Sequence, residues 1–175
     1  VINWSEGILD EVRIIGDLVK QTPMLTVSTK SRGTAQRIRI TISGSNVNQT
    51  FECQANQSQQ FEIPGAELWH PRGFGEQNLY RVEVALLDES GELIDQIEKR
   101  IGFRKVELDQ SPIGDRQMFA IKVNGHRVWA RGVNWIPDDP FPHRVTEQQY
   151  REKIQGLFDV EVNAIRVWGG GIYES

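Results

Sequence analysis

Alternation of apolar and polar residues dominates the first part of the chain. Ile38, Ile40 and Ile42 alternate with polar side chains, which is the two-residue period of a strand that buries one face. Other runs rich in β-branched residues follow from Thr22 on, and polar turns separate them. This spacing is typical of a small sandwich, so residues 21–105 are predicted to form an immunoglobulin-like β-sandwich. The predicted strands cover residues 26–30, 37–43, 49–55, 59–63, 79–88 and 94–103.

The first twenty residues carry two overlapping patterns. Four apolar residues recur at helical spacing, whereas residues 11–15 have the pattern of a short strand. Gly7 and Gly16 weaken the helix, so the strand is favoured. The four residues at helical spacing are Ile8, Val12, Ile15 and Val19.

The pattern changes again after Phe103. Asn124-Gly125 lies between two apolar runs within residues 118–130, and this dipeptide is the strongest short signal for a hairpin. Thr146 and Gln149 predict a capping box at the start of a helix that ends near Asp159. Apolar runs at 133–135 and 164–168 flank the helix, so a strand, a helix and a second strand are predicted, the unit that builds parallel sheets. The helical stripe expected to face the sheet is Tyr150, Ile154, Leu157 and Phe158.

Polar and aromatic side chains gather at the carboxyl ends of these two strands, where parallel sheets collect their chemistry. Arg166 is either half of a structural ion pair or a residue that positions catalytic carboxylates, because a buried guanidinium needs a partner. Trp135 and Trp168 are either core residues or platforms that stack on a sugar ring. Asn134 can both donate hydrogen bonds to hydroxyls and accept them from hydroxyls. A sugar is the ligand that this set favours.

Other motifs point to chemistry less specifically. Residues 68–84 form either a ligand site or a covering loop in which Trp69 and Phe74 plug the end of the sandwich. The triple glycine at 169–171 lacks the spacing of a phosphate-binding loop. Single residues with no role assigned are Cys53, read as a small buried side chain, and His70, which has no second metal ligand near it. Asn3, Asn48 and Asn56 begin Asn-x-Ser/Thr triplets, which only weakly indicate secretion.

Composition narrows the class of protein. The apolar fraction is 38% and the net charge is -4, with acidic and basic residues scattered along the chain, so a globular protein without a nucleic-acid partner is expected. No apolar run approaches the about 20 residues of a membrane helix, so no membrane partner is expected. The lone cysteine excludes a thiolate metal cluster. The chain starts at Val1 and not at methionine, so we expect an internal part of a longer protein.

The segments RGVNWIPDDPF (131–141) and NAIRVWGGGIYE (163–174), with a helix between them, resemble the start of the catalytic barrel in β-mannosidases of glycoside hydrolase family 2. GILDEVRI (7–14) resembles the last strand of that family's sugar-binding jelly-roll domain. LWHPRGFGEQNLYRVEV (68–84) resembles the signature of its immunoglobulin-like domain. The resemblance implies a jelly-roll strand and linker in residues 1–20, the sandwich in 21–105, and a truncated start of a (β/α)8 barrel in 106–175, within a mainly β chain.

Family members hydrolyse terminal β-D-mannose by a retaining mechanism that uses two glutamates about 5 Å apart. The resemblance places both glutamates after later barrel strands. It therefore implies that this chain contains no catalytic residue and that Glu174 has a structural role. The fragment alone is therefore predicted to be inactive. Arg166 is implied to position the nucleophile, and Asn134, Trp135 and Trp168 are implied to line the sugar site. No metal or organic cofactor is implied, and the partners are a β-mannoside and the remainder of the parent chain.

Alternatives remain open at this point. The chain is otherwise a non-catalytic carbohydrate-binding or interaction module, or part of another family 2 enzyme such as a β-galactosidase, β-glucuronidase or exo-glucosaminidase. β-Galactosidases and β-glucuronidases carry a Ser/Thr-His pair where this chain has Val167-Trp168-Gly169, which favours the mannosidases. Two barrel strands leave apolar faces and strand edges uncovered, so residues 106–175 are expected to be marginally stable alone. The sandwich, another chain or a larger molecule is expected to order them. The compartment and the oligomeric state stay open.

Overall fold

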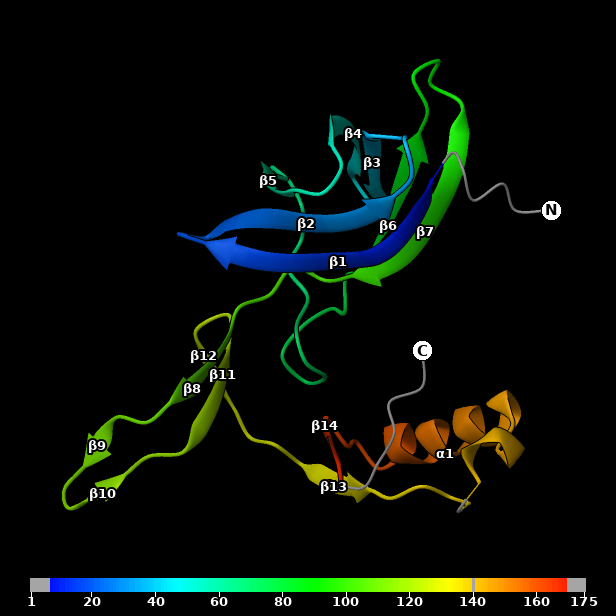
Figure 1. Ribbon diagram of the computed structural model, residues 1–175. Coiled ribbons are helices and arrows are strands. Elements are labelled where there is room, and N and C mark those ends of the chain that lie inside the picture. The colour runs from blue at the N-terminus through cyan, green and yellow to red at the C-terminus, as the bar shows by residue number, and fades with distance from the viewer. Residues whose placement is uncertain (1–6, 140, 170–175) are drawn as a thin grey trace. The chain divides into compact units, whose positions relative to one another are not determined.

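The structure is a computed structural model that describes residues 7–139 and 141–169 (Figure 1). The Asn3 triplet, Glu174 and most of the glycine turn at 169–171 lie outside the described residues. The chain divides into two compact units. Unit 1 comprises Val1–His70 and Glu76–Lys105, and unit 2 comprises Pro71–Gly75 and Val106–Ser175.

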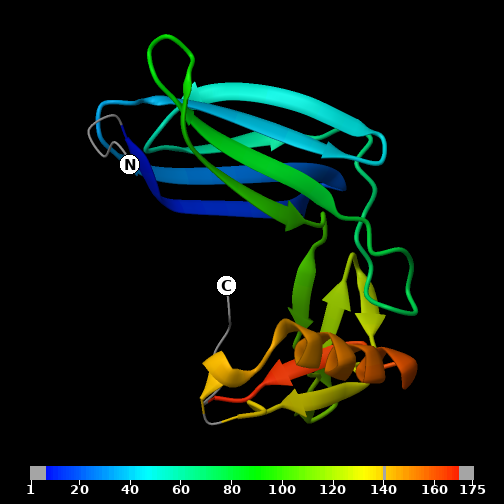
Figure 2. The same ribbon diagram turned by 90° about the vertical axis from the view of Figure 1, so that its right-hand side faces the viewer.

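Unit 1 is a β-sandwich, as the alternating pattern predicted. One sheet has the order β1-β2-β5 and the other the order β4-β3-β6-β7, and the two lie face to face (Figure 2). Pairing is antiparallel throughout both sheets, as is usual in a β-sandwich. The strands are β1 (Ile8–Val19), β2 (Thr22–Arg32), β3 (Arg37–Gly44), β4 (Val47–Gln54), β5 (Ser58–Glu62), β6 (Tyr80–Leu87) and β7 (Leu93–Ile101).

The core of unit 1 lies between the two sheets. Ile38, Ile40 and Ile42 are 0% exposed, which confirms the predicted inward face of β3. Val82 and Val84 of the neighbouring strand β6 are also 0% exposed. The residues between them in β3 are partly exposed, so the period of two seen in the sequence is the period of burial in β3, whereas β6 is buried continuously from Val84 to Leu87.

Strand β1 is longer than the expected segment 11–15, and it pairs with β2 over its whole length. Residues 8–19, expected to close a preceding domain and form a linker, are therefore part of the sandwich here. Val19 pairs with Thr22, and the two residues between them, Lys20 and Gln21, have φ of 49° and 69°. Two positive φ values define a type I′ hairpin turn, which normally carries Asn-Gly, so this turn gave no sequence signal.

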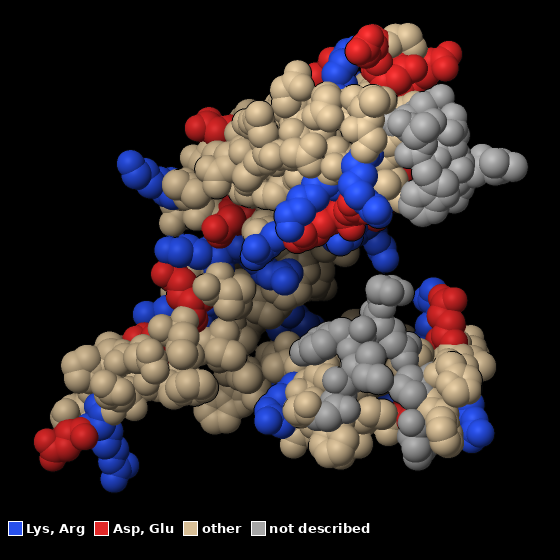
Figure 3. Space-filling view, viewed as in Figure 1, with Lys and Arg blue, Asp and Glu red and all other residues tan. Residues whose placement is uncertain are grey.

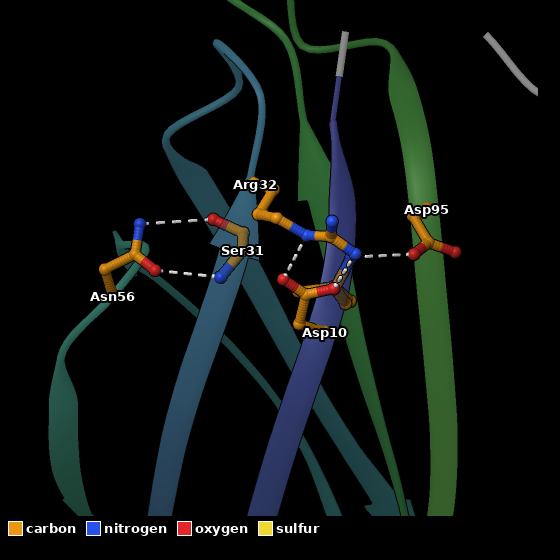
Figure 4. Close-up of polar contacts among 6 residues, drawn as sticks. Asp10, Ser31, Arg32, Asn56 and Asp95 are labelled. Atoms are coloured by element: carbon orange, nitrogen blue, oxygen red, sulfur yellow. Dashed lines mark hydrogen bonds and ion pairs between the residues drawn. The ribbon is translucent and has the colours of Figure 1, made fainter. Parts of the chain in front are cut away.

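Side chains tie the edge strands of the two sheets together near the start of β1 (Figure 4). The pairing of β1 with β2 shifts between Leu9 and Glu11, which leaves Asp10 at a bulge where it binds the Arg32 guanidinium through two bonds of 2.6 and 2.7 Å. The Leu9 N–H donates to Asp95 of β7 at 2.9 Å. The bulge therefore turns the β1 backbone toward the opposite sheet, where a carboxylate accepts its free donor.

The loop between β5 and β6 begins with a buried tyrosine contact. Tyr80 is 0% exposed, and its hydroxyl accepts a 2.7 Å hydrogen bond from the Glu67 N–H, which ties the loop to the start of β6. Trp69 packs against Gly102, where an added Cβ would lie 2.6 Å from the Trp69 Cβ. Trp69 thus covers the sandwich as predicted. Phe74 is 40% exposed and belongs to unit 2.

Unit 2 contains three small sheets and the helix. The predicted hairpin at 124–125 is confirmed, with φ of 52° at Asn124 and 80° at Gly125. Helix α1 (Glu147–Asp159) has the predicted capping box between Thr146 and Gln149. The other elements are β8 (Val106–Asp109), β9 (Pro112–Ile113), β10 (Arg116–Gln117), β11 (Ala120–Val123), β12 (His126–Val128), β13 (Gly132–Trp135), η1 (Pro142–Arg144) and β14 (Ala164–Val167).

Burial differs sharply between the units. Among the described residues of unit 2, only Pro71 and Val123 have buried apolar side chains. Helix α1 buries no residue fully, and Ile154 and Phe158 of its predicted stripe are 52% and 54% exposed. The described residues of unit 2 form no closed barrel. On the visible face in Figure 3, basic and acidic side chains are interspersed, and neither sign gathers into an extended patch.

Candidate functional site

The candidate residues lie on the strand–helix–strand part of unit 2. β13 and β14 pair in parallel, and α1 connects them, which confirms the predicted order of elements. Asn134 is directly opposite Arg166 in this register. The Arg166 Nη1 donates to the Asn134 Oδ1 at 3.3 Å, so the two side chains meet on one face of the sheet. Both lie near the carboxyl ends of their strands, as predicted.

Trp135 lies on the opposite face of β13 because successive side chains of a strand alternate. Its ring stacks on Tyr150 of α1 with centroids 6.2 Å apart, and the Lys153 ammonium lies 4.3 Å from the ring centroid. Lys153 also forms an ion pair with Asp138, in the loop that follows β13. Trp135 therefore anchors the helix to the strand, and this contact leaves Asn134 and Arg166 on the face that α1 does not cover.

Trp168 follows the last residue of β14. Its backbone N–H donates to the Trp135 carbonyl at 3.2 Å, which extends the pairing of the two strands by one step. The Trp168 side chain is 44% exposed. The structure thus brings Asn134 and Arg166 into direct contact and links Trp135 to Trp168 through the backbone. It does not collect all four side chains on one surface.

The surroundings of Arg166 bear on the two readings of this residue. Arg166 is exposed, and it donates a hydrogen bond to the neutral amide of Asn134. Among residues 7–139 and 141–169, no carboxylate forms an ion pair with it. A guanidinium carries five N–H donors, so most of its capacity to bind a carboxylate or a hydroxyl is unused within the described residues. The described residues therefore give Arg166 no structural ion pair, and its exposure differs from the buried position expected from the sequence.

Sequence reasoning missed the residue that fixes the amino ends of the two strands. The Asn163 Oδ1 accepts from the Arg131 N–H at 2.9 Å, and the Asn163 N–H donates to the Arg131 carbonyl at 3.1 Å. The Asn163 Nδ2 donates to the Trp129 carbonyl at 3.0 Å. One amide side chain thus sets the register that places Arg166 opposite Asn134. An asparagine directly before a short apolar run was the available signal.

Other polar groups have structural partners. Lys122 binds Asp109 at 2.7 Å, and the Ser111 hydroxyl donates to Asp109 at 2.6 Å, so these two contacts hold the Asp109 pKa well below its usual range. Burial raises the pKa of the half-buried Cys53 thiol, which makes it a poor nucleophile. In the described part of the chain no group of His, Cys, Asp and Glu is arranged to hold a metal ion. No described helix is both long and apolar enough to cross a membrane.

Comparison with known proteins identifies the family of this chain. The family model described as "Glycosyl hydrolases family 2" matches residues 8–104, from the first residue of β1 to the end of the sandwich. Beta-mannosidase B of Thermothelomyces thermophilus is 32% identical over 98% of this chain and 20% of its own length. Beta-mannosidase of Bos taurus is 40% identical over 62% of this chain and 12% of its own length. The chain therefore spans at most about a fifth of these relatives.

Solved structures match across both units. The crystal structure of beta-D-mannosidase from Dictyoglomus thermophilum has a TM-score of 0.87 and 33% identity, and the match covers 98% of this chain and 22% of that one. A beta-glucuronidase of Bifidobacterium dentium has a TM-score of 0.72 at 20% identity and covers 92% of this chain and 27% of its own. The second match is at the level of the fold. The first extends over the strands that carry Asn134 and Arg166.

Proposed function

The chain belongs to glycosyl hydrolase family 2, and from this premise we propose that it is part of a retaining exo-β-mannosidase that removes terminal β-linked mannose. The observation that carries the proposal is the similarity to β-mannosidases over nearly the whole chain, both units included. Residues 106–175 are proposed to start a (β/α)8 barrel, since β13, α1 and β14 form the repeating unit of that fold. A sugar-binding jelly-roll domain would precede the sandwich.

Within this proposal, Arg166 positions the nucleophilic carboxylate, and Asn134 binds a sugar hydroxyl. Both side chains lie on the face of the sheet that α1 leaves open, which is the inner face of a barrel whose helices lie outside. Trp135 lines the site only through the end of its strand, because its ring contacts Tyr150 and Lys153. Trp168 is proposed to offer its exposed indole to the apolar face of a sugar ring.

This polypeptide alone is proposed to be inactive. A retaining glycosidase needs two carboxylates about 5 Å apart on either side of the scissile bond. No described carboxylate binds Asn134 or Arg166, so a nucleophile and an acid would come from later strands of the parent. No metal or organic cofactor is proposed. The remainder of the parent chain is proposed to cover the apolar surface of unit 2, where Phe119, Trp129 and Val160 are 78%, 80% and 70% exposed.

The test compares two polypeptides. The 175-residue chain should release no nitrophenol from p-nitrophenyl β-mannoside above a buffer control, whereas the complete gene product should hydrolyse it. Replacement of Arg166 by Ala in the complete product should lower kcat/KM about 100-fold, since misplacing a reacting group by 1 Å costs that much. Arg116→Ala, in the distant β9–β10 hairpin, is the matched control and should not change the rate.

A comparison of four aryl glycosides distinguishes a mannosidase from the other enzymes of the family. The complete product should prefer the aryl β-mannoside over the β-glucuronide, β-galactoside and β-glucosaminide. A preference for one of the other three would refute the mannosidase and keep the family. Clear turnover by the 175-residue chain would overturn the statement that its catalytic carboxylates lie elsewhere.

A further inference from the structure

The carboxyl end of α1 lacks a cation of its own. The helix closes with a Schellman motif, in which the Val162 N–H donates to the Leu157 carbonyl at 3.1 Å and the Glu161 N–H donates to the Phe158 carbonyl at 3.0 Å. No basic residue lies in its last turn, where Asp159 adds a negative charge instead. The carbonyls at a helix carboxyl end carry a partial negative charge, so this end attracts a cation from elsewhere in the chain.

Arg72 supplies that cation from the segment Pro71–Gly75, which is part of unit 2 although its sequence neighbours belong to unit 1. The Arg72 Nη1 donates to the Phe158 carbonyl. The centre of its guanidinium lies 3.7 Å from the centroid of the Phe158 ring. One side chain therefore satisfies the second lone pair of a terminal carbonyl and stacks on the aromatic ring of the same residue, two contacts that suit the planar guanidinium.

The same segment meets the start of β13. A Cβ built on Gly73 would lie 3.5 Å from the Arg131 Nη2. Arg131 forms an ion pair of 3.3 Å with Glu161, which holds a φ of 58° just after the helix. Arg131 also shares two hydrogen bonds with Asn163, directly before β14. The segment Pro71–Gly75 thus contacts the end of α1 directly and lies beside Arg131, which is bonded to the residue before β14.

We propose that Arg72 is a positioning residue: by capping the carboxyl end of α1, it holds β14 in register with β13 and so sets the place of Arg166. The signature loop is then a support of the strand–helix–strand unit and not a ligand site. The effect of Arg72 on substrate hydrolysis rests on the proposed function, because it requires Arg166 to position the nucleophile. The capping of α1 by Arg72 does not depend on that function.

The capping is tested by hydrogen exchange on the 175-residue chain, read for residues 158–167. Arg72→Ala should speed exchange there about fivefold to thirtyfold, the effect of losing a helix-end cation together with a stacked contact. Arg72→Lys keeps the charge and loses the stack, so its rates should fall between those of the wild type and of Arg72→Ala. The matched control is Arg104→Ala, which removes a comparable stack on Trp69, 4.4 Å from the ring centroid in unit 1.

A double-mutant cycle guards against a general loss of folding. Phe158→Leu removes the stack and keeps the carbonyl contact, so adding Arg72→Ala to Phe158→Leu should accelerate exchange less than Arg72→Ala does in the wild type. Exchange in residues 120–128 should stay unchanged throughout. Equal rates in wild type and Arg72→Ala, equal acceleration in 120–128, or strict additivity of the two substitutions would each overturn the proposal. In the complete gene product, Arg72→Ala should lower kcat for the aryl β-mannoside and Arg72→Lys should restore part of it.

The two proposals fail in different ways. An inactive complete product would refute the proposed function and leave the exchange result standing. An active product whose exchange is indifferent to Arg72 would refute the capping and leave the mannosidase standing.

Discussion

A methyl group added at Gly102 should destabilise unit 1. Gly102 follows β7, and a Cβ built there would lie 2.6 Å from the Trp69 Cβ and 2.9 Å from its Cγ. Carbon atoms pack at about 3.5 to 4.0 Å, so the overlap is about 1 Å. Trp69 has little room to withdraw, because its N–H donates to the Phe103 carbonyl at 2.9 Å and the Arg104 guanidinium lies over its ring.

The magnitude follows from two opposed effects. Overpacking of this kind costs about 1 to 3 kcal/mol, while a Gly→Ala change recovers about 0.4 to 1 kcal/mol by restricting the unfolded chain. Gly102→Ala should therefore lower the free energy of unfolding of unit 1 by about 1 to 2 kcal/mol. Gly156→Ala is the matched control, and it is expected to change stability in the opposite direction. It lies inside α1 with nothing within 4 Å of an added Cβ, so helix propensity alone should raise the stability of that helix by about 1 kcal/mol.

Native-state hydrogen exchange reads the two units separately. The amides of Ile40 and Val84, in the central strands β3 and β6, report the opening of unit 1, and the amides of α1 report its own opening. Gly102→Ala should reduce protection at Ile40 and Val84 and leave α1 unchanged. Gly156→Ala should increase protection in α1 and leave Ile40 and Val84 unchanged. Unchanged protection in the Gly102 variant would refute the argument that Trp69 is held in place.

Three further predictions concern single polar groups. Tyr80→Phe leaves the Glu67 N–H without its partner and should cost unit 1 about 1 to 3 kcal/mol in urea unfolding. Thr29 is 6% exposed and its hydroxyl has no partner among the described residues, so Thr29→Val should raise the same free energy by about 1 kcal/mol. The folded pKa of Asp109 is depressed by Lys122, so its contribution is present above the unfolded pKa of about 3.9 and is lost as pH falls below it. Protection against exchange in β11 should fall below about pH 4, and Asp109→Asn should remove that dependence.

The sequence predicted the sandwich well because its strands carry strong local signals. The alternation around Ile40 reports burial directly, and Asn124-Gly125 has the backbone preference that its turn requires. The β1–β2 hairpin went unpredicted because Lys20-Gln21 adopts two positive φ values without the residues that favour them. That turn is imposed by the pairing of the flanking strands, which no local pattern contains.

The sequence predicted the strands and the helix that carry the candidate site, but not which face of the sheet the helix covers. Strand ends and a capped helix placed Asn134 and Arg166 near each other, and the structure shows the bond between them. The separation of Trp135 from Asn134 follows from alternation along β13, but the face covered by α1 depends on the contact with Tyr150. The role of Arg72 was hidden for a stronger reason: the residue lies 86 positions from Phe158.

The two units reach their stability by different means, and this bears on how the site works. Unit 1 buries apolar side chains from both sheets, so its strands hold each other without help from charges. Within the described residues, unit 2 buries only two apolar side chains, Pro71 and Val123, and β13 with β14 is a two-stranded sheet. Parallel strands are normally covered on both faces, since their backbone pairing alone contributes little. The position of Arg166 in this chain therefore depends on a few polar contacts: Asn163 at the amino ends of the strands, and Arg72 at the end of α1. Catalytic geometry demands tolerances well below 1 Å, which rigid elements usually supply, so the remaining barrel strands of the proposed parent are needed for placing Arg166 as much as for supplying carboxylates.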